Sequence, residues 1–247
     1  MKIHQKIVGV IPARLDSQRL PGKVLLNIGN KAMIHWVYDR ARKSPLLGKL
    51  LVATDSEKVR QYCTEQGIPV ILTRQHSSGT DRLHEVMERT DGDIYVNIQG
   101  DEPTVRTDHI ELLLRPIIAR KADVTTLKVA IDPAAALDPN VVKVVTDNHG
   151  RALYFSRFPI PFDRDTQGRN RFYKHIGLYG YTRSALDLFH GMPQSSLELT
   201  EKLEQLRYLE NGIPILVAET MHDTIGVDTE ADLAQAAVFL AAEGKSG

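Results

Sequence analysis

Apolar runs and amphipathic segments alternate through the first 121 residues, and this alternation restricts the possible folds more than any other feature of the chain. The runs expected to be strands are Ile7–Ile11, Leu50–Ala53, Val70–Leu72 and Asp93–Gln99. The segments expected to be helices are Ala32–Lys43, Glu57–Gln66, Asp81–Arg89 and His109–Lys121. Strands that alternate with helices in this way predict an α/β fold, with a parallel sheet covered by helices on both faces.

The second half of the chain changes to a β-rich pattern. Strands are expected at Asp123–Ile131, Val141–Thr146, Ala152–Ser156, His175–Tyr181 and Ile213–Ala218. Helices are expected at Ser184–Phe189, Glu198–Asn211 and Thr229–Ala242. The strands between about residues 120 and 180 look antiparallel. We therefore expect one domain over residues 1–247, with a β-rich substrate lobe inserted into a mostly parallel core.

Charge and hydropathy exclude several classes of protein. Lys plus Arg and Asp plus Glu each number 31, so the formal net charge is zero. Non-specific nucleic-acid binding depends on a positive surplus and is not expected. No run reaches the roughly 18 apolar residues of a membrane span, and residues 1–6 lack the apolar core of a signal peptide. Cys63 is the single cysteine. We expect a cytoplasmic protein with neither nucleic acid nor membrane as a partner.

A cationic loop follows the first expected strand. It holds Arg14, Arg19 and Lys23, and Pro21 with Gly22 favours a shaped turn over a helix. The carboxyl end of a strand is where open α/β sheets bind ligands. Two guanidiniums and an ammonium suit a polyanion such as a nucleotide triphosphate, although a solvated basic loop is an equal alternative. Neither G-x-x-x-x-G-K-[ST] nor G-x-G-x-x-G follows the first strand, so a nucleotide needs this loop.

Two aspartates stand next to the ends of other expected elements. Asp101 follows the expected strand that ends at Gln99, and Asp228 precedes the terminal helix. Mg²⁺ takes one or two carboxylates together with phosphate oxygens, so this pair is a candidate metal site. The structural alternatives are a surface turn for Asp101 and a helix N-cap for Asp228.

Two further groups suit recognition of a substrate. Small polar residues at Ser77–Arg82, with Gly79 among them, can read the edge of a planar base, or can simply start a helix that Ser78 or Thr80 caps. Arg157 can hold a substrate carboxylate through two hydrogen bonds. His175 is a hydrogen-bonding group or base, or a structural residue in a β-rich segment.

Taken together, these motifs resemble the sugar cytidylyltransferases, and among them the branch that activates 3-deoxy-manno-octulosonate (Kdo). The resemblance covers about residues 7–235. The matching segments are Pro12–Lys23, Val52–Asp55, Ser78–Leu83, Val96–Pro103, Ala152–Arg157, Lys174–Tyr181, Glu201–Arg207 and Gly226–Thr229.

The resemblance implies a Rossmann-like nucleotidyltransferase core whose inserted lobe helps to form a homodimer. It implies an enzyme that couples CTP to Kdo with Mg²⁺, giving CMP-Kdo and pyrophosphate for lipopolysaccharide synthesis. By the resemblance, Lys23, Arg14 and Asp101 carry catalysis and Asp101 and Asp228 bind the metal. The nucleotide is bound by Arg14, Arg19, Lys23, Ser78 and Gly79. The sugar is bound by Gln99, Tyr154, Arg157, His175, Glu204 and Gln205.

The chain departs from the family pattern at three positions beside the site. Val24, Ala32 and Glu230 stand where the family usually has proline. A variant acidic sugar, such as 8-amino-Kdo or a sialic-acid-like sugar, is therefore an alternative substrate. A family 2-like glycosyltransferase and a non-catalytic nucleotide-binding domain are the alternatives from other classes. The Asp-x-Asp metal motif of a glycosyltransferase is matched only literally by Asp91-Gly92-Asp93, because these residues precede the expected strand and do not follow it.

Overall fold

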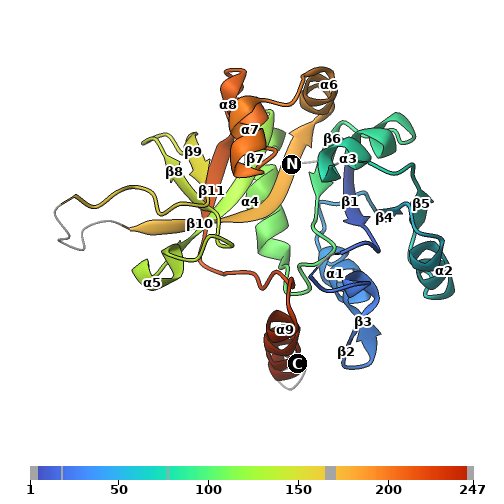
Figure 1. Cartoon of the computed structure of the whole chain (residues 1–247). Helices are drawn as coiled ribbons and strands as arrows, with labels where there is room; N and C mark the ends of the chain where they lie inside the picture. The colour runs from blue at the N-terminus through green and yellow to red at the C-terminus, as the bar shows by residue number, and fades with distance from the viewer. Residues whose placement is uncertain (1–4, 18, 77, 165–170, 244–247) are drawn as a thin grey trace. The chain divides into compact units, whose positions relative to one another are not determined.

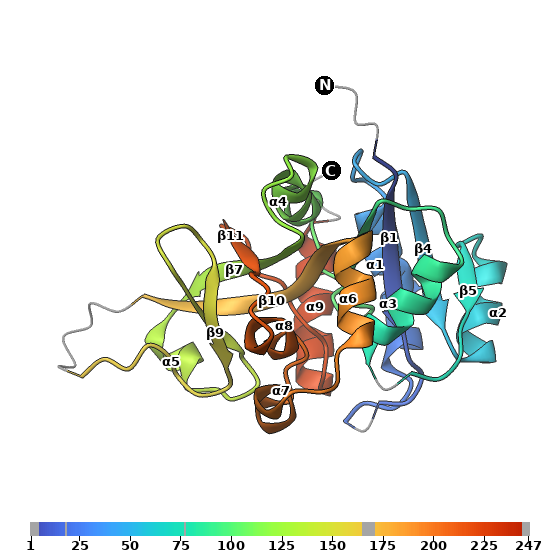
Figure 2. The same ribbon diagram turned by 90° about the horizontal axis from the view of Figure 1, so that it is seen from above.

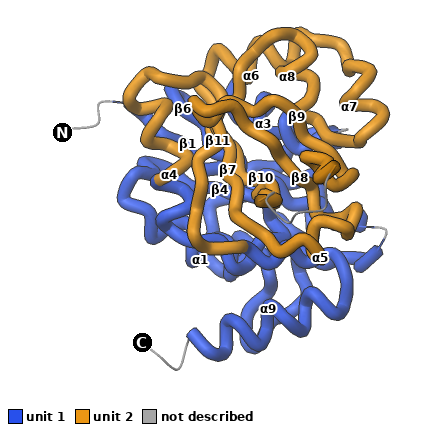
Figure 3. The backbone as a smooth tube through the Cα atoms, turned by 90° about the vertical axis from the view of Figure 1, so that its left-hand side faces the viewer, with its two compact units in different colours: residues 1–111, 224–247 blue, residues 112–223 orange. Residues whose placement is uncertain are grey.

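The computed structural model describes residues 5–17, 19–76, 78–164 and 171–243 (Figure 1). They form two compact units, coloured separately in Figure 3. Unit 1 is Met1–Glu111 with Thr224–Gly247, and unit 2 is Leu112–Asp223. Helix α4 (Thr107–Ile118) crosses the boundary.

Unit 1 is built on a parallel sheet, as the sequence predicts. Its strand order is β6 (Ile94–Asn97), β1 (Ile7–Ala13), β4 (Lys49–Thr54) and β5 (Val70–Leu72). Strand β1 lies between β4 and β6, with Gly9 opposite both Leu50 and Val96. Six of its seven residues are buried, which explains its continuous apolar sequence.

Three helices connect these strands. They are α1 (Met33–Ala41), α2 (Glu57–Glu65) and α3 (Gly79–Glu88). Right-handed crossovers place α1 and α2 on one face of the sheet and α3 on the other (Figure 2). Helix α3 contacts β1 and β6. The chain moves outward from β1 to β5 and then returns to β6 on the far side of β1. The carboxyl ends of β1 and β6 therefore flank a topological switch point, where such sheets bind ligands.

The end of the chain adds a further helix to unit 1. Helix α9 (Glu230–Glu243) packs its buried Ala236 and Leu240 against a cluster that includes Leu20 and Met33. A short hairpin, β2 (Asn27–Ile28) with β3 (Lys31–Ala32), and the 3₁₀ helix η1 (Lys23–Leu25) precede α1. The sequence pattern did not predict the hairpin or η1.

Unit 2 is a mixed sheet with short helices. Strand β7 (Val124–Ile131) pairs antiparallel with β10 (Phe172–Thr182) and parallel with β11 (Leu216–Thr220). Strand β8 (Lys143–Thr146) pairs antiparallel with β10 and with β9 (Ala152–Ser156). The helices are α5 (Pro133–Ala136), α6 (Arg183–Gly191), α7 (Ser196–Glu201) and α8 (Leu206–Glu210). The β-rich segment expected near residues 120–180 lies within this unit.

The expected single helix over Glu198–Asn211 is wrong. Lys202 adopts a left-handed conformation, with φ of 55°, and separates α7 from α8. In one continuous helix residues 198 and 207 would lie about 13.5 Å apart along the axis. The break instead brings the Arg207 guanidinium 2.5 Å from Glu198, and both side chains are about 95% buried. Tertiary ion pairing therefore overrides the helical pattern.

A smaller difference concerns the start of the last strand. Strand β11 begins at Leu216 and not at Ile213. Among the described residues, no helix is long and apolar enough to cross a membrane.

Candidate functional site

A cavity of about 460 Å³ opens at the carboxyl ends of β1, β4 and β5 in unit 1. We call it the edge cavity, and its lining residues are Arg14, Leu15, Asp16, Asp55, Ser56, Thr73, Gln75 and His76. Arg14, predicted to bind triphosphate, is exposed at its rim immediately after β1. The parallel register brings the ends of three strands to the same edge, so residues separated by 60 positions line one space.

Helix α3 fixes part of the cavity wall through Arg82. Its guanidinium has no exposed surface and donates to Asp55 Oδ2 at 2.9 Å and to Thr73 Oγ1 at 2.6 Å. Sequence reasoning gave Arg82, Asp55 and Thr73 no role. An arginine on the apolar face of a helix is a usable signal, because charged side chains are rarely buried without a partner.

Glu85, one turn further along α3, holds the same loop. Its carboxylate accepts hydrogen bonds from the Arg74 amide at 3.0 Å and contacts His76 Nε2 at 2.6 Å. Burial opposes ionisation of Glu85, but the hydrogen bonds from His76 and Arg74 keep its pKa below the usual value. The loop between β5 and α3 is thus attached to the helix by two charged side chains, Arg82 and Glu85.

Ser78 caps α3, which confirms the helix-start interpretation of this segment. Its Oγ accepts from the Asp81 amide at 3.0 Å and donates to Asp81 Oδ2 at 2.8 Å. A Cβ at Gly79 would lie 3.8 Å from Asn97 Nδ2, so the start of α3 lies beside the end of β6. Gln99 Nε2 is 3.5 Å from Asn97 Oδ1 on the same edge. Ser77 lies outside the described residues.

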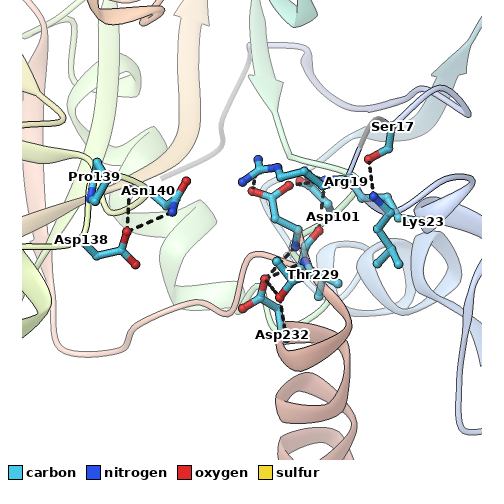
Figure 4. A network of polar contacts seen from close by, with 12 residues as sticks. Ser17, Arg19, Lys23, Asp101, Asp138, Pro139, Asn140, Thr229 and Asp232 are labelled. Carbon is cyan, nitrogen blue, oxygen red and sulfur yellow. Dashed lines mark hydrogen bonds and ion pairs between the residues drawn. The ribbon is translucent and has the colours of Figure 1, made fainter.

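The predicted metal ligands Asp101 and Asp228 meet around one ammonium group. Lys23 and Asp101 lie in one network of polar contacts (Figure 4), in which Lys23 Nζ donates to Asp101 Oδ2 at 2.5 Å. The same ammonium donates to Asp228 Oδ1 at 2.8 Å and to the Val227 carbonyl at 3.0 Å. We call Lys23, Asp101 and Asp228 the acid–lysine cluster. Burial acts to lower the pKa of Lys23, but the two carboxylates outweigh it, and the pKa is raised.

Backbone geometry builds this cluster from distant segments. A Cβ at Gly100 would lie 2.7 Å from the Pro12 carbonyl, so only glycine lets the loop after β6 lie against the end of β1. Gly22, with φ of 68°, starts η1 and presents Lys23. The Val227 amide donates to the Asp101 carbonyl at 2.9 Å, which joins the segment before α9 to the loop.

Asp228 is not the N-cap of α9. The Asp232 amide donates to Thr229 Oγ1 at 3.3 Å, and the Thr229 amide donates back to Asp232 Oδ2 at 2.8 Å. This reciprocal pair fulfils the capping role. Asp228 is left to face the cations: its Oδ2 accepts from Arg19 at 2.8 Å while its Oδ1 accepts from Lys23.

The cluster has the donor set that Mg²⁺ requires. Two carboxylates already share a cation, and Mg²⁺ usually binds one or two carboxylates together with waters and substrate phosphates. No group of three or more His, Cys, Asp or Glu suited to a metal occurs in the part of the chain that the structure describes. A metal held here would therefore take its remaining ligands from water and substrate.

The alternative metal motif, Asp91-Gly92-Asp93, lies at the opposite end of the strands. Both carboxylates precede β6: Asp93 accepts from the Lys6 amide at 2.8 Å, and Asp91 pairs with the Lys6 ammonium. This is the amino edge of the parallel sheet, away from the carboxyl ends of its strands. The structure confirms that this motif precedes its strand, as the sequence indicates, which does not suit the metal site of a glycosyltransferase.

Unit 2 holds the other predicted sugar-binding residues. Arg157 follows β9, and its guanidinium donates to the Glu201 carbonyl at 2.9 Å and to the Pro139 carbonyl at 3.1 Å. The Glu201 carboxylate binds the Arg157 amide at 2.9 Å. Tyr154 is half-buried, and burial together with Glu201 raises its pKa. Glu204 is half-buried and Gln205 is buried, both just before α8.

His175 is a packed, neutral residue of unit 2. Its Nε2 lies 3.0 Å from Thr126 Oγ1, and its ring packs edge-on to Phe155 with centroids 4.9 Å apart. Burial, with a smaller contribution from Lys174, lowers its pKa to about 3. A group with so low a pKa has little power to accept a proton at neutral pH, so the structure favours the packing role over the base.

The chain is similar to known proteins over most of its length. A sequence model of the family described as cytidylyltransferase matches residues 8–220. A 3-deoxy-manno-octulosonate cytidylyltransferase of Koribacter versatilis is 51% identical, over 92% of this chain and 87% of its own. One from Acidobacterium capsulatum is also 51% identical, over 92% and 93%. The solved structure of CMP:2-keto-3-deoxy-manno-octonic acid synthetase complexed with CTP is 45% identical, covers 96% of this chain and 99% of its own, and superposes with a TM-score of 0.92.

Proposed function

Because this chain belongs to the cytidylyltransferase family, we propose that it couples CTP to Kdo, giving CMP-Kdo and pyrophosphate for lipopolysaccharide synthesis. The observation that carries the proposal is the acid–lysine cluster, which lies after β6 at the carboxyl edge of the unit 1 sheet, the same edge at which the edge cavity opens. Two carboxylates and several cations at a topological switch point suit a metal-bound triphosphate.

The reaction is an in-line attack of the anomeric hydroxyl of the sugar on the α-phosphorus of CTP, with pyrophosphate as the leaving group. Such chemistry needs alignment and charge neutralisation more than covalent help. We assign Arg14, Arg19 and Lys23 to the triphosphate, where their charges stabilise the departing pyrophosphate. Ser78 and Gly79, at the start of α3, are assigned to the cytosine base.

Asp101 and Asp228 are proposed to hold Mg²⁺. When bound, the metal neutralises charge on the phosphates and makes the attacking hydroxyl more acidic. The two side chains suit this role because one cation already contacts both. Their positions are set by the Val227–Asp101 backbone hydrogen bond and by the capping of α9 through Thr229.

For the acidic sugar we propose Arg157 as the partner of the carboxylate. Two backbone carbonyls fix its guanidinium plane, which favours hydrogen bonding in a defined direction. Gln99, Tyr154, Glu204 and Gln205 remain proposed contacts to sugar hydroxyls. His175 is proposed to support this region by packing.

The test is release of pyrophosphate from purified protein. Each of the four nucleoside triphosphates is paired with Kdo, 8-amino-Kdo, sialic acid and no sugar. The proposal expects release with CTP and Kdo and a much lower rate with every other pair. Greatest activity with 8-amino-Kdo or sialic acid would favour the variant-sugar alternative. Absence of release with any acidic sugar would overturn the proposal and leave a non-catalytic nucleotide-binding domain.

We also propose that the protein works as a cytoplasmic homodimer. Among the described residues of unit 2, the large apolar side chains that are more than 60% exposed are Leu137, Leu153, Phe158, Phe162 and Met221. A contiguous exposed apolar patch marks an interaction surface, and we assign Phe158 and Phe162, which are close in sequence after β9, to the proposed dimer contact. Light scattering should give twice the mass of the chain, and Phe158→Ser with Phe162→Ser should shift it toward the monomer. Cell fractionation tests the location.

A further inference from the structure

The Lys23 ammonium uses all its hydrogen-bonding capacity within the protein. An ammonium has three N–H donors, and Lys23 has three acceptors within 3.0 Å: Asp101 Oδ2, Asp228 Oδ1 and the Val227 carbonyl. Its side chain is 12% exposed. Lys23 therefore has no N–H left for a phosphate oxygen in this arrangement.

Two different cations, Mg²⁺ and the Lys23 ammonium, compete for the carboxylates of Asp101 and Asp228. The proposed function assigns Asp101 and Asp228 to Mg²⁺ and Lys23 to the triphosphate, whereas the structure binds Lys23 to both acids. A metal that bridges Asp101 Oδ2 and Asp228 Oδ1 must take the place of the ammonium that holds them at 2.5 and 2.8 Å. Both assignments hold together only if Lys23 moves.

We propose that Lys23 is an exchangeable counter-ion, which keeps Asp101 and Asp228 together and leaves them for the triphosphate when Mg²⁺ binds. The inference rests on the proposed function. Without Lys23, Asp228 would keep its ion pair with Arg19, but Asp101 would lose the cation that it shares with Asp228, and the two carboxylates would repel each other. With it, the acids stay close, at the expense of metal affinity.

Exchange makes metal and nucleotide binding cooperative. Metal alone must displace Lys23 into a site with no phosphate to receive it, and CTP alone must draw Lys23 away from two acids. When both bind, the metal takes the place of Lys23 at the acids and the phosphates offer Lys23 a new partner. Linkage then requires each ligand to strengthen binding of the other by the same factor.

The first experiment titrates Mn²⁺ into the protein without nucleotide and measures free metal by electron paramagnetic resonance. We expect Lys23→Met, which keeps the length of the stem, to bind Mn²⁺ about tenfold more tightly than the wild type, within the usual range of site coupling. Adding Asp101→Asn to that variant should abolish the gain. Lys31→Met is the matched control, since Lys31 pairs with Asp39 in the same unit. The proposal is overturned if Lys23→Met binds Mn²⁺ with the same affinity as the wild type. It is also overturned if Lys31→Met gains as much affinity for Mn²⁺ as Lys23→Met does.

The second experiment uses the wild-type protein and does not depend on a variant folding. Lysines are acetylated with acetic anhydride, and rates at Lys23 and Lys31 are read by mass spectrometry. Mg²⁺ alone should raise the Lys23 rate about threefold or more, because coupling of this size frees the amine. CTP added with Mg²⁺ should lower it again. Lys31 should not change. A Lys23 rate that is unchanged or lowered by Mg²⁺ alone contradicts exchange.

Neither readout depends on turnover. If the wild type releases pyrophosphate from CTP and Kdo while both readouts fail, only the exchange is overturned. If pyrophosphate release fails, the proposed function falls whatever the metal titration gives.

Discussion

The Arg82 guanidinium, fully buried in α3, donates to Asp55 Oδ2 at 2.9 Å at the end of β4. Its second partner, Thr73, follows β5. One side chain thus connects a helix to the ends of two neighbouring strands, and both partners line the edge cavity. Arg82 is a positioning residue for the wall of the proposed nucleotide site.

Arg82→Met should destabilise the protein and weaken CTP binding. Removing one partner of a buried ion pair costs about 3–5 kcal/mol, because the other charge loses its compensation. Asp55 keeps 24% exposure, so the lower end of that range is expected. Displaced Asp55 and Thr73 should raise KM for CTP more than they lower kcat. Urea unfolding and steady-state kinetics measure the two effects.

Arg60→Met is the matched control for this substitution. Arg60 pairs with Glu57 on the exposed face of α2, where ion pairs contribute little. We expect no measurable change in stability or in KM. A stable Arg82→Met protein with an unchanged KM for CTP would remove the positioning role.

Asp101→Asn should abolish most turnover and leave the fold intact. The amide removes the charge that the proposed metal needs, and loss of one preorganised electrostatic group typically lowers kcat by about 10²–10³. Circular dichroism should be unchanged. Pyrophosphate release at saturating CTP and Kdo is the measurement.

Asp91→Asn provides the control for Asp101. Asp91 belongs to the alternative metal motif and is 85% exposed at the amino edge of the sheet. We expect wild-type turnover from it. Full activity in Asp101→Asn together with loss in Asp91→Asn would reverse the assignment of the metal site.

Ser78→Ala should show both roles of this residue. Loss of the α3 N-cap destabilises by about 1 kcal/mol, since the Asp81 amide loses its acceptor. If Ser78 also contacts the base, KM for CTP should rise. Thermal unfolding and kinetics give the two values.

Ser78→Asn separates capping from base recognition. Asparagine is a good N-cap, so stability should return to near the wild-type value. A KM that stays raised would support contact with the base. A KM restored together with stability would mean that Ser78 acts only through the helix.

Stability should fall in acid partly because of His175. Burial sets its folded pKa at about 3, below the ordinary value of 6.5. The unfolded chain therefore binds this proton more readily, and the stability contribution is complete above pH 6.5 and is lost as pH falls toward 3. The slope reaches at most about 1.4 kcal/mol per pH unit. Urea unfolding across this window measures it.

His175→Gln isolates that contribution from other titrating groups. The variant keeps a polar side chain near Thr126 but cannot take up the proton. Its stability should depend less steeply on pH between 3 and 6.5. If the free energy of unfolding depended on pH in the same way in the wild type and in His175→Gln, His175 would not be buried as a neutral group.

Much of unit 1 could be predicted from the sequence, because its strands and helices carry local signals. The buried run Ile7–Ile11 and the amphipathic Ala32–Lys43 match β1 and α1 within two residues. Short polar elements gave weaker signals, and the β2–β3 hairpin has only two residues in each strand. The prediction of one helix over Glu198–Asn211 was wrong because a buried ion pair between Glu198 and Arg207 requires the chain to turn between them.

By itself, the sequence determined the alternation of strands and helices, the cationic loop after β1 and the acidic residues that resemble a family pattern. Only the tertiary structure decided which groups share hydrogen bonds. Lys23, Asp101 and Asp228 lie up to 205 positions apart, and their meeting depends on strand order and close backbone contacts. Local propensity acts over one helical turn or strand repeat, whereas the pairing of charges depends on distances that exist only after the chain has folded.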